Sequence, residues 1–159
     1  KDGKIDPDLH LVNPNRFVPT NFALVPAGGR SPWDPPRKVV DAKGERLWFK
    51  QDIDGKGKNW KAKPKLSVMF QITTPVASKT ARTSVLTQLY TMLYHDAMTL
   101  TTYDATMAGL SWALGKTDDG LTFSVNGYSD KLPLLLSQVT KGMVKCLHAS
   151  ASGARKPCA

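Results

Sequence analysis

The chain has 159 residues, a formal net charge of +9, 41% hydrophobic residues and 22% charged residues. The length suggests one domain that can bury a core of its own, and the apolar and charged fractions are ordinary for a globular protein. No apolar run reaches membrane-spanning length, because the longest, residues 132–136, is interrupted by Pro133. We therefore expect no membrane partner.

Residues 1–37 are rich in Pro, Asn and Gly and follow neither a helical nor a strand period. We interpret them as an irregular connector. Within it, NPNRFVPTNFALVP (residues 13–26) carries Phe17, Phe22 and Leu24 among prolines and asparagines. Two interpretations stay open: a loop packed on its own domain, or a connector lying against a neighbouring domain.

The N-terminus KDGKIDPDLH has no apolar core of the signal-peptide kind. Cys146 and Cys158 form no CxxC motif, and a disulfide between them would close only the tail. Reduced cysteines are the simpler reading, and we expect a cytoplasmic rather than a secreted protein.

Two strands are predicted next. ERLWFKQD (residues 45–52) places Leu47 and Phe49 on one face, and KLSVMFQITT (residues 65–74) alternates apolar and polar residues over its whole length. We expect the two to pair as an antiparallel hairpin with a long loop.

A helix is predicted from Ser78 or Thr80, either of which could cap it, to Gly109. Its apolar residues recur at spacings of three and four, which is typical of an amphipathic helix that packs one face on the core. This face comprises Val85, Leu86, Leu89, Met92, Leu93, Ala97 and Leu100, with Asp96 as a polar intrusion.

The remaining elements repeat this order. LSWALGK and LTFSVNGYS flank the turn TDDG, in which Gly120 supplies a positive φ. A last helix begins at Asp130 with Pro133 in its first turn, and its apolar stripe comprises Leu134, Leu135, Gln138, Val139 and Met143. Residues 38–143 are therefore predicted to be an α+β domain, an antiparallel sheet with helices on one face and a ββαββα core. Residues 144–159 read as a disordered tail.

No motif in the chain carries catalysis. DIDGKGKNWKAK opens like a calcium loop, but Lys56 and Lys63 stand where oxygen ligands belong. A zinc helix around His95 would need a second His one turn away, and positions 98 and 99 are Met and Thr. We therefore predict no catalytic residue, no metal ligand and no cofactor in this chain.

A lysine-rich segment with a central Trp60 offers one binding hypothesis. Its basic residues are Lys56, Lys58, Lys61, Lys63 and Lys65, with no acidic residue among them. Such a loop could hold phosphates and stack a base, so an anion-binding or nucleic-acid-binding module is an alternative function. A solvated loop explains the same residues, and the absence of an RNA-binding or zinc-finger motif beside it argues against nucleic acid.

Several segments together resemble the insulin-degrading enzyme and pitrilysin family of zinc metalloendopeptidases. They are NPNRFVPTNFALVP, ERLWFKQD, PKLSVMFQITTP, AGLSWALGKTDDGLTFSVNGYSDKLPLLL and the closing KGM, over residues 9–143. The resemblance is to the third of four homologous domains. After residue 143 the chain departs from the family pattern, which favours a fragment or a truncated product.

The resemblance implies a function that the residues alone do not. In this family the zinc motif HxxEH lies in the first domain, and HDAMT at His95 lacks it. The third domain is then a non-catalytic part of the chamber that closes over the peptide. Zinc, peptide substrate and proteolysis would belong to the full-length parent, with other domains of the same peptidase as partners. We expect the chain alone to be inactive, and its connector aromatics to pack where domains meet.

Overall fold

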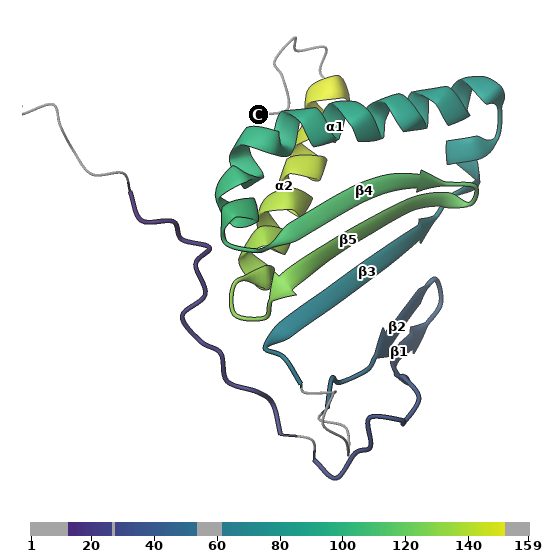
Figure 1. Cartoon of the computed structure of the whole chain (residues 1–159). Helices are drawn as coiled ribbons and strands as arrows, with labels where there is room; N and C mark the ends of the chain where they lie inside the picture. Colours follow the sequence, from purple (N-terminus) through teal and green to yellow (C-terminus); the bar gives the residue numbers. More distant parts are fainter. Residues whose placement is uncertain (1–12, 27, 54–61, 152–159) are drawn as a thin grey trace, which may run out of the picture.

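The computed structural model describes residues 13–26, 28–53 and 62–151 (Figure 1). The elements, in chain order, are β1 (Arg37–Ala42), β2 (Glu45–Phe49), β3 (Lys65–Thr73), the short 3-10 helix η1 (Pro75–Ser78), α1 (Ala81–Met107), β4 (Ser111–Thr117), β5 (Gly120–Tyr128) and α2 (Leu132–Ala151). Helices combined with antiparallel strands confirm the predicted α+β class. Among the described residues, neither helix is long and apolar enough to cross a membrane.

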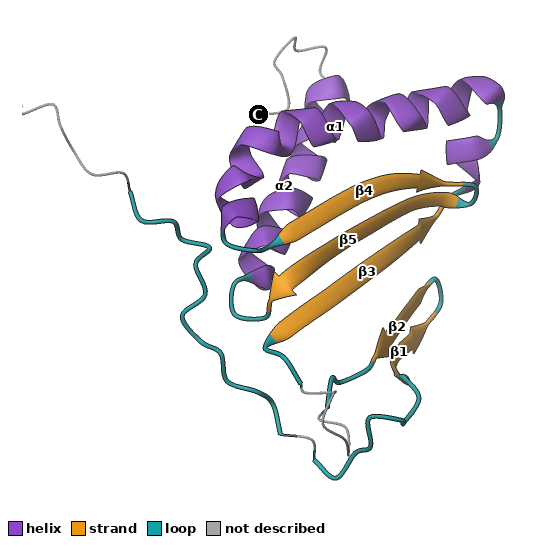
Figure 2. Ribbon diagram, viewed as in Figure 1, coloured by secondary structure: helices purple, strands orange, loops and turns teal. Residues whose placement is uncertain are grey.

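The main sheet has three antiparallel strands in the order β3-β5-β4, with both helices on one side of it (Figure 2). The alternation predicted for β5 is confirmed, because Phe123 and Val125 are buried. Phe70 and Val68 lie directly opposite them on β3 and therefore share the same face. This face forms the floor of the core.

The predicted pairing of the first two strands is wrong. β2 pairs with β1, a strand not predicted from the sequence, and the two form a separate two-stranded sheet. The reason is local: Lys43 and Gly44 close a two-residue turn, with Gly44 at φ +85°. Pairing β2 with β3 would instead require closure of a much longer loop, at a greater cost in chain entropy.

The predicted start and end of α1 are confirmed, but its predicted core face is wrong. Thr80 caps the helix through a reciprocal pair of bonds with Thr83, and Gly109 follows the helix end at φ +78°. The face that packs on the sheet and α2 is rich in hydroxyl groups. Its buried residues are Thr91, Tyr94, Met98, Thr102 and Ala105.

Burial of these threonines is tolerated because their hydroxyls are satisfied. Thr91 Oγ1 donates to the Gln88 carbonyl, and Thr102 Oγ1 donates to the Met98 carbonyl, both at 2.8 Å. The Thr102 hydroxyl also accepts a bond from Trp112 Nε1 on β4, at 3.1 Å. The buried hydroxyls of Thr91 and Thr102 therefore add no penalty of unpaired polar groups to this packing.

The leucines that the sequence placed in the core face outward instead. Leu93 is 61% exposed and Leu100 is 88% exposed. The same surface of α1 also carries Val85, Leu86, Leu89, Met92, Tyr103 and Met107, all of them exposed. α1 is thus apolar on two sides, and the structure covers only one of them.

The last helix begins close to its predicted start but differs in its buried face and its end. Leu132, Leu135 and Val139 are fully buried, whereas Leu134 is partly exposed. α2 continues to Ala151, past residue 143, after which the sequence predicted a disordered tail. The final residues, 152–159, lie outside the described residues, as do the side chains of both cysteines.

The tight β4–β5 turn generates a prediction. Gly120 lies at φ +150°, and a Cβ there would stand 2.1 Å from the Ile72 carbonyl oxygen on β3. We expect Gly120→Val to lower the free energy of unfolding by about 3 kcal/mol, because both strain and backbone overlap must be relieved. Denaturant unfolding measures the change.

The matched control is Gly115→Ala on β4. A Cβ at Gly115 meets nothing within 4 Å, and the backbone there is ordinary, so we expect a change within about 0.5 kcal/mol. Equal effects at the two glycines would show that the β3–β5 contact at Gly120 is not formed as described.

Candidate functional site: the connector and the groove beside it

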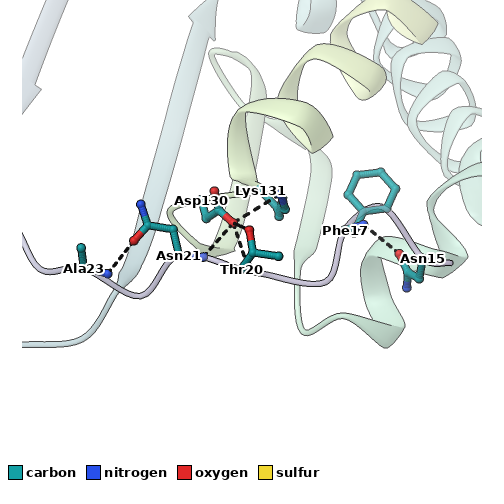
Figure 3. Close-up of polar contacts among 7 residues, drawn as sticks. All are labelled: Asn15, Phe17, Thr20, Asn21, Ala23, Asp130 and Lys131. Atoms are coloured by element: carbon teal, nitrogen blue, oxygen red, sulfur yellow. Dashed lines mark hydrogen bonds and ion pairs between the residues drawn. The ribbon is translucent and has the colours of Figure 1, made fainter.

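The connector's first half is built into the domain core. Phe17 is only 1% exposed and packs in the same cluster as Tyr94 and Leu135. Asn15 fixes its approach, since its Oδ1 accepts the Phe17 N–H at 2.9 Å (Figure 3). Its Nδ2 also donates to the Asp104 carbonyl at 2.6 Å. This aromatic residue therefore belongs to the domain itself.

A second attachment is made by Asp130, at the turn between β5 and α2. Its Oδ2 accepts the Thr20 N–H at 2.9 Å, the Thr20 hydroxyl at 3.2 Å and the Asn21 N–H at 3.2 Å (Figure 3). Lys131 Nζ lies 3.4 Å from the same oxygen. One carboxylate thus holds two consecutive backbone amides of an otherwise irregular segment.

These contacts change the acidity of Asp130. The Thr20 backbone N–H is the main cause that lowers the pKa of this carboxyl below its ordinary value of 3.8, and the Asn21 N–H and Lys131 act in the same direction. The Asp130 carboxyl is therefore ionised at any pH well above 3.8. The sequence identified this residue only as a helix start, so its role as an anchor was missed.

A polar link from Arg16 crosses to α2, where the guanidinium bonds the Gln138 side-chain oxygen. Gln138 in turn donates its Nε2 to the Thr101 carbonyl of α1 at 2.6 Å. The sequence placed Gln138 in an apolar stripe, but the structure uses it to join the connector to both helices.

The connector's second half rests more loosely on the domain. Phe22 meets Tyr128 edge-to-face, with ring centroids 5.6 Å apart, yet remains 54% exposed. Farther on, Gln51 Nε2 donates to the Val25 and Pro26 carbonyls at 2.9 and 3.0 Å. Of the two interpretations left open, packing on the chain's own domain is right for Phe17. The exposed side chains of Phe22, Leu24 and Val25 leave an apolar surface uncovered.

A groove of about 390 Å³ lies between the connector, the end of β2 and the beginning of β3. Its charged lining residues are Lys50, Lys63, Lys65 and Asp52. Lys65 Nζ stands 5.1 Å above the ring of Tyr128, and the Lys63 backbone N–H bonds Asp52 Oδ2 at 3.4 Å. The groove is positively charged but contains its own acidic residue.

The structure describes only two of the five lysines of the predicted anion-binding site. Lys63 and Lys65 both line the groove, whereas Lys56, Lys58 and Lys61 lie outside the described residues. Anion binding by the five lysines therefore stays a prediction.

The residues around His95 do not fit a zinc ion. The imidazole of His95 lies against the Trp112 indole at a tilt of 32°, with ring centroids 5.2 Å apart. In the part of the chain that the structure describes, no three His, Cys, Asp or Glu side chains converge on one point. Protein zinc sites use three or four such ligands.

Comparison with known proteins gives the family. Residues 1–152 match the family model for the middle or third domain of peptidase M16. The chain is 32% identical to the A-factor-processing enzyme of Saccharomyces cerevisiae over 143 residues, which is 90% of this chain and 13% of that protein. It is 34% identical to the insulin-degrading enzyme of Homo sapiens over 134 residues, which is 84% of this chain and 12% of that protein.

A putative zinc protease of Schizosaccharomyces pombe is 32% identical over 140 residues, which is 88% of this chain and 14% of that protein. The chain thus spans a small part of each of these relatives. A family match over nearly the whole chain, on an α+β unit, confirms the resemblance found in the sequence. The chain belongs to the peptidase M16 family and corresponds to its middle or third domain.

Proposed function

We propose that this chain is a non-catalytic, structural domain of a zinc metalloendopeptidase, and that it contributes to the wall of the peptide-binding chamber. The match of residues 1–152 to the middle or third domain of the family carries the proposal. The relatives' names supply the activity of the parent, since they include an insulin-degrading enzyme, an A-factor-processing enzyme and a putative zinc protease. Zinc and peptide cleavage are assigned to the parent and not to this chain.

The surface of the domain is consistent with a role as one part of a larger assembly. Exposed apolar side chains gather on the outward side of α1, on the connector around Val25, and on the β1–β2 hairpin around Trp48. An independent small domain rarely leaves so much apolar surface in water. We propose that other domains of the same polypeptide cover it.

The connector has a defined part in this proposal. Phe17 and Asp130 attach its first half to the core, while its second half presents Phe22 and Val25 outward. A connector attached in this way would hold the domain at a fixed position relative to whatever precedes it. It would not act as a flexible tether.

The first prediction concerns activity. The purified chain should neither bind zinc stoichiometrically nor cleave insulin-like peptides, because the residues that the structure describes assemble no zinc ligand set around His95. Metal analysis after dialysis and a peptide-cleavage assay with and without chelator test this. Chelator-sensitive cleavage by the pure chain would contradict the proposal, and an HxxEH motif in the upstream reading frame of the gene would support it.

The second prediction concerns the connector. Because the folded-state pKa of Asp130 is lowered, its contribution to stability is present above about pH 3.8 and is lost as the pH falls through the lower folded value. The Thr20 amide proton should therefore resonate downfield at neutral pH and move upfield only in strong acid. Asp130→Asn should produce the upfield position at neutral pH, as measured by NMR.

Asp118→Asn is the control for this measurement, since Asp118 lies on the exposed β4–β5 turn. The Thr20 amide should keep its wild-type position in that variant. A Thr20 shift that is the same in wild type and Asp130→Asn would show that the connector is not held by this carboxylate.

A further inference from the structure

The apolar residues on the exposed side of α1 recur with a period of seven. Leu86, Leu93, Leu100 and Met107 recur at every seventh position, and each is more than half exposed. Leu89 and Tyr103 fall three residues after two of them and are also exposed. We call this set, together with Asp96, the heptad stripe.

A period of seven residues indicates what can cover the stripe. Apolar residues at a and d positions of a heptad present a continuous seam to a second helix that crosses at a shallow angle. A strand or an irregular loop would not match a seam that follows a helix for about 32 Å, the length of twenty-one residues at 1.5 Å each. The matching occupant is therefore an α-helix packed along α1.

The stripe continues onto a hollow in the same surface. Leu86 also lines a cavity of about 340 Å³ whose other apolar walls include Val76, Tyr90 and Leu121. These residues come from η1, α1 and β5, so the hollow lies where α1 begins above the sheet. A large side chain near one end of a covering helix could fill it.

The charge of Asp96 restricts which helices can bind along the heptad stripe. It is exposed in the middle of the heptad stripe, at the d position between Leu89 and Tyr103. Within the described residues its carboxylate has no ion-pair partner. A helix laid along the stripe would desolvate this charge, and only a cation opposite it would compensate the cost.

This charge argues against a second copy of the chain. In parallel pairing of two α1 helices in register, each Asp96 would face the other. In antiparallel pairing centred on the stripe, the two carboxylates would again be neighbours at the centre. Like charges brought together at a helix seam disfavour both arrangements.

We propose that the heptad stripe binds an amphipathic α-helix from another part of the same polypeptide, with apolar a and d residues and a Lys or Arg opposite Asp96. The inference rests on the proposed function, since the chain spans only 13% of one relative and 12% of another. The covering helix would exclude water from the leucines and neutralise the carboxylate.

The test uses a synthetic helix as the probe. A fluorescent peptide about three heptads long, with leucines at a and d and a lysine at its central d position, is titrated with the whole 159-residue chain. A second peptide carries glutamate at that central position. Fluorescence anisotropy should show binding of the lysine peptide, and at least about tenfold weaker binding of the glutamate peptide.

Variants of the chain locate the binding site. Leu93→Glu should abolish binding without lowering the melting temperature, because Leu93 is 61% exposed and is not part of the core cluster. Gln88→Glu adds the same charge at an exposed position of α1 outside the stripe and should leave binding unchanged. Asp96→Asn should bind both peptides with similar affinity, because the source of discrimination is gone.

Three outcomes would overturn the inference: no binding of the lysine peptide, equal binding of both peptides by the unmodified chain, or a stable dimer that Leu93→Glu dissociates in sedimentation velocity. These outcomes are separate from the proposed function, which fails only if the chain itself binds zinc and cleaves peptides. If the chain both binds the lysine peptide and cleaves insulin-like peptides, the inference about the heptad stripe stands and the proposed non-catalytic role is contradicted.

Discussion

The orientation of α1 depends on the burial of Tyr94 at the point where the two helices and the sheet meet. Its hydroxyl donates to the Val139 carbonyl of α2 at 2.5 Å, and its ring meets the Trp112 ring edge-on at 5.7 Å. Burial raises the pKa of this hydroxyl, so it remains a neutral donor across the physiological range. A tyrosine satisfied in this way fixes the rotation of the helix about its axis.

α2 is shaped to accept this side chain. Gly142 lies opposite the tyrosine, and a Cβ there would stand 2.8 Å from the Tyr94 hydroxyl oxygen. A larger residue at this position would therefore push the Tyr94 or Met98 side chain out of its place between the two helices. With α1 held in this rotation, Thr91 and Thr102 face the core, and Leu93 and Leu100 must face outward.

The connector depends on the same junction. Phe17 packs in the cluster that contains Tyr94, and the Arg16–Gln138 link joins it to α2. The segment that has no regular structure of its own is consequently ordered by the packed helices. Its order comes from side-chain and carboxylate contacts, and backbone periodicity could not have revealed them.

The sequence predicted well where one residue pattern has one physical meaning. Strict alternation in residues 121–125 predicted the buried face of β5, and Thr80 and Gly109 predicted the limits of α1. Prediction from sequence failed where two packing arrangements compete for the same element. α1 has two faces that could be buried, and a count of apolar residues selects the leucines, whereas threonines that bond their own helix are buried at little cost.

The residues that attach the connector were not identified from the sequence for a different reason. Asp130 and Gln138 bind partners more than a hundred positions away in the sequence, through contacts that carry no local pattern. The pairing of β1 with β2 was missed because a distant partner was expected where a local one forms. β2 was predicted to pair with β3, but the two-residue turn at Lys43 and Gly44 brings β1 beside it at a lower cost in chain entropy. The family resemblance could supply the domain identity, because it depends on residue types along the whole chain.

The most direct test of this account is the solvent accessibility of individual leucine methyl groups. A soluble paramagnetic probe should relax the methyl signals of Leu93 and Leu100 strongly, and those of Leu110 and Leu135 hardly at all, because the first two are exposed and the others are buried. The Tyr94 ring protons should be protected as well. Strong relaxation of Tyr94 together with protection of Leu93 and Leu100 would show that α1 packs on the sheet through its leucines, and would contradict the account.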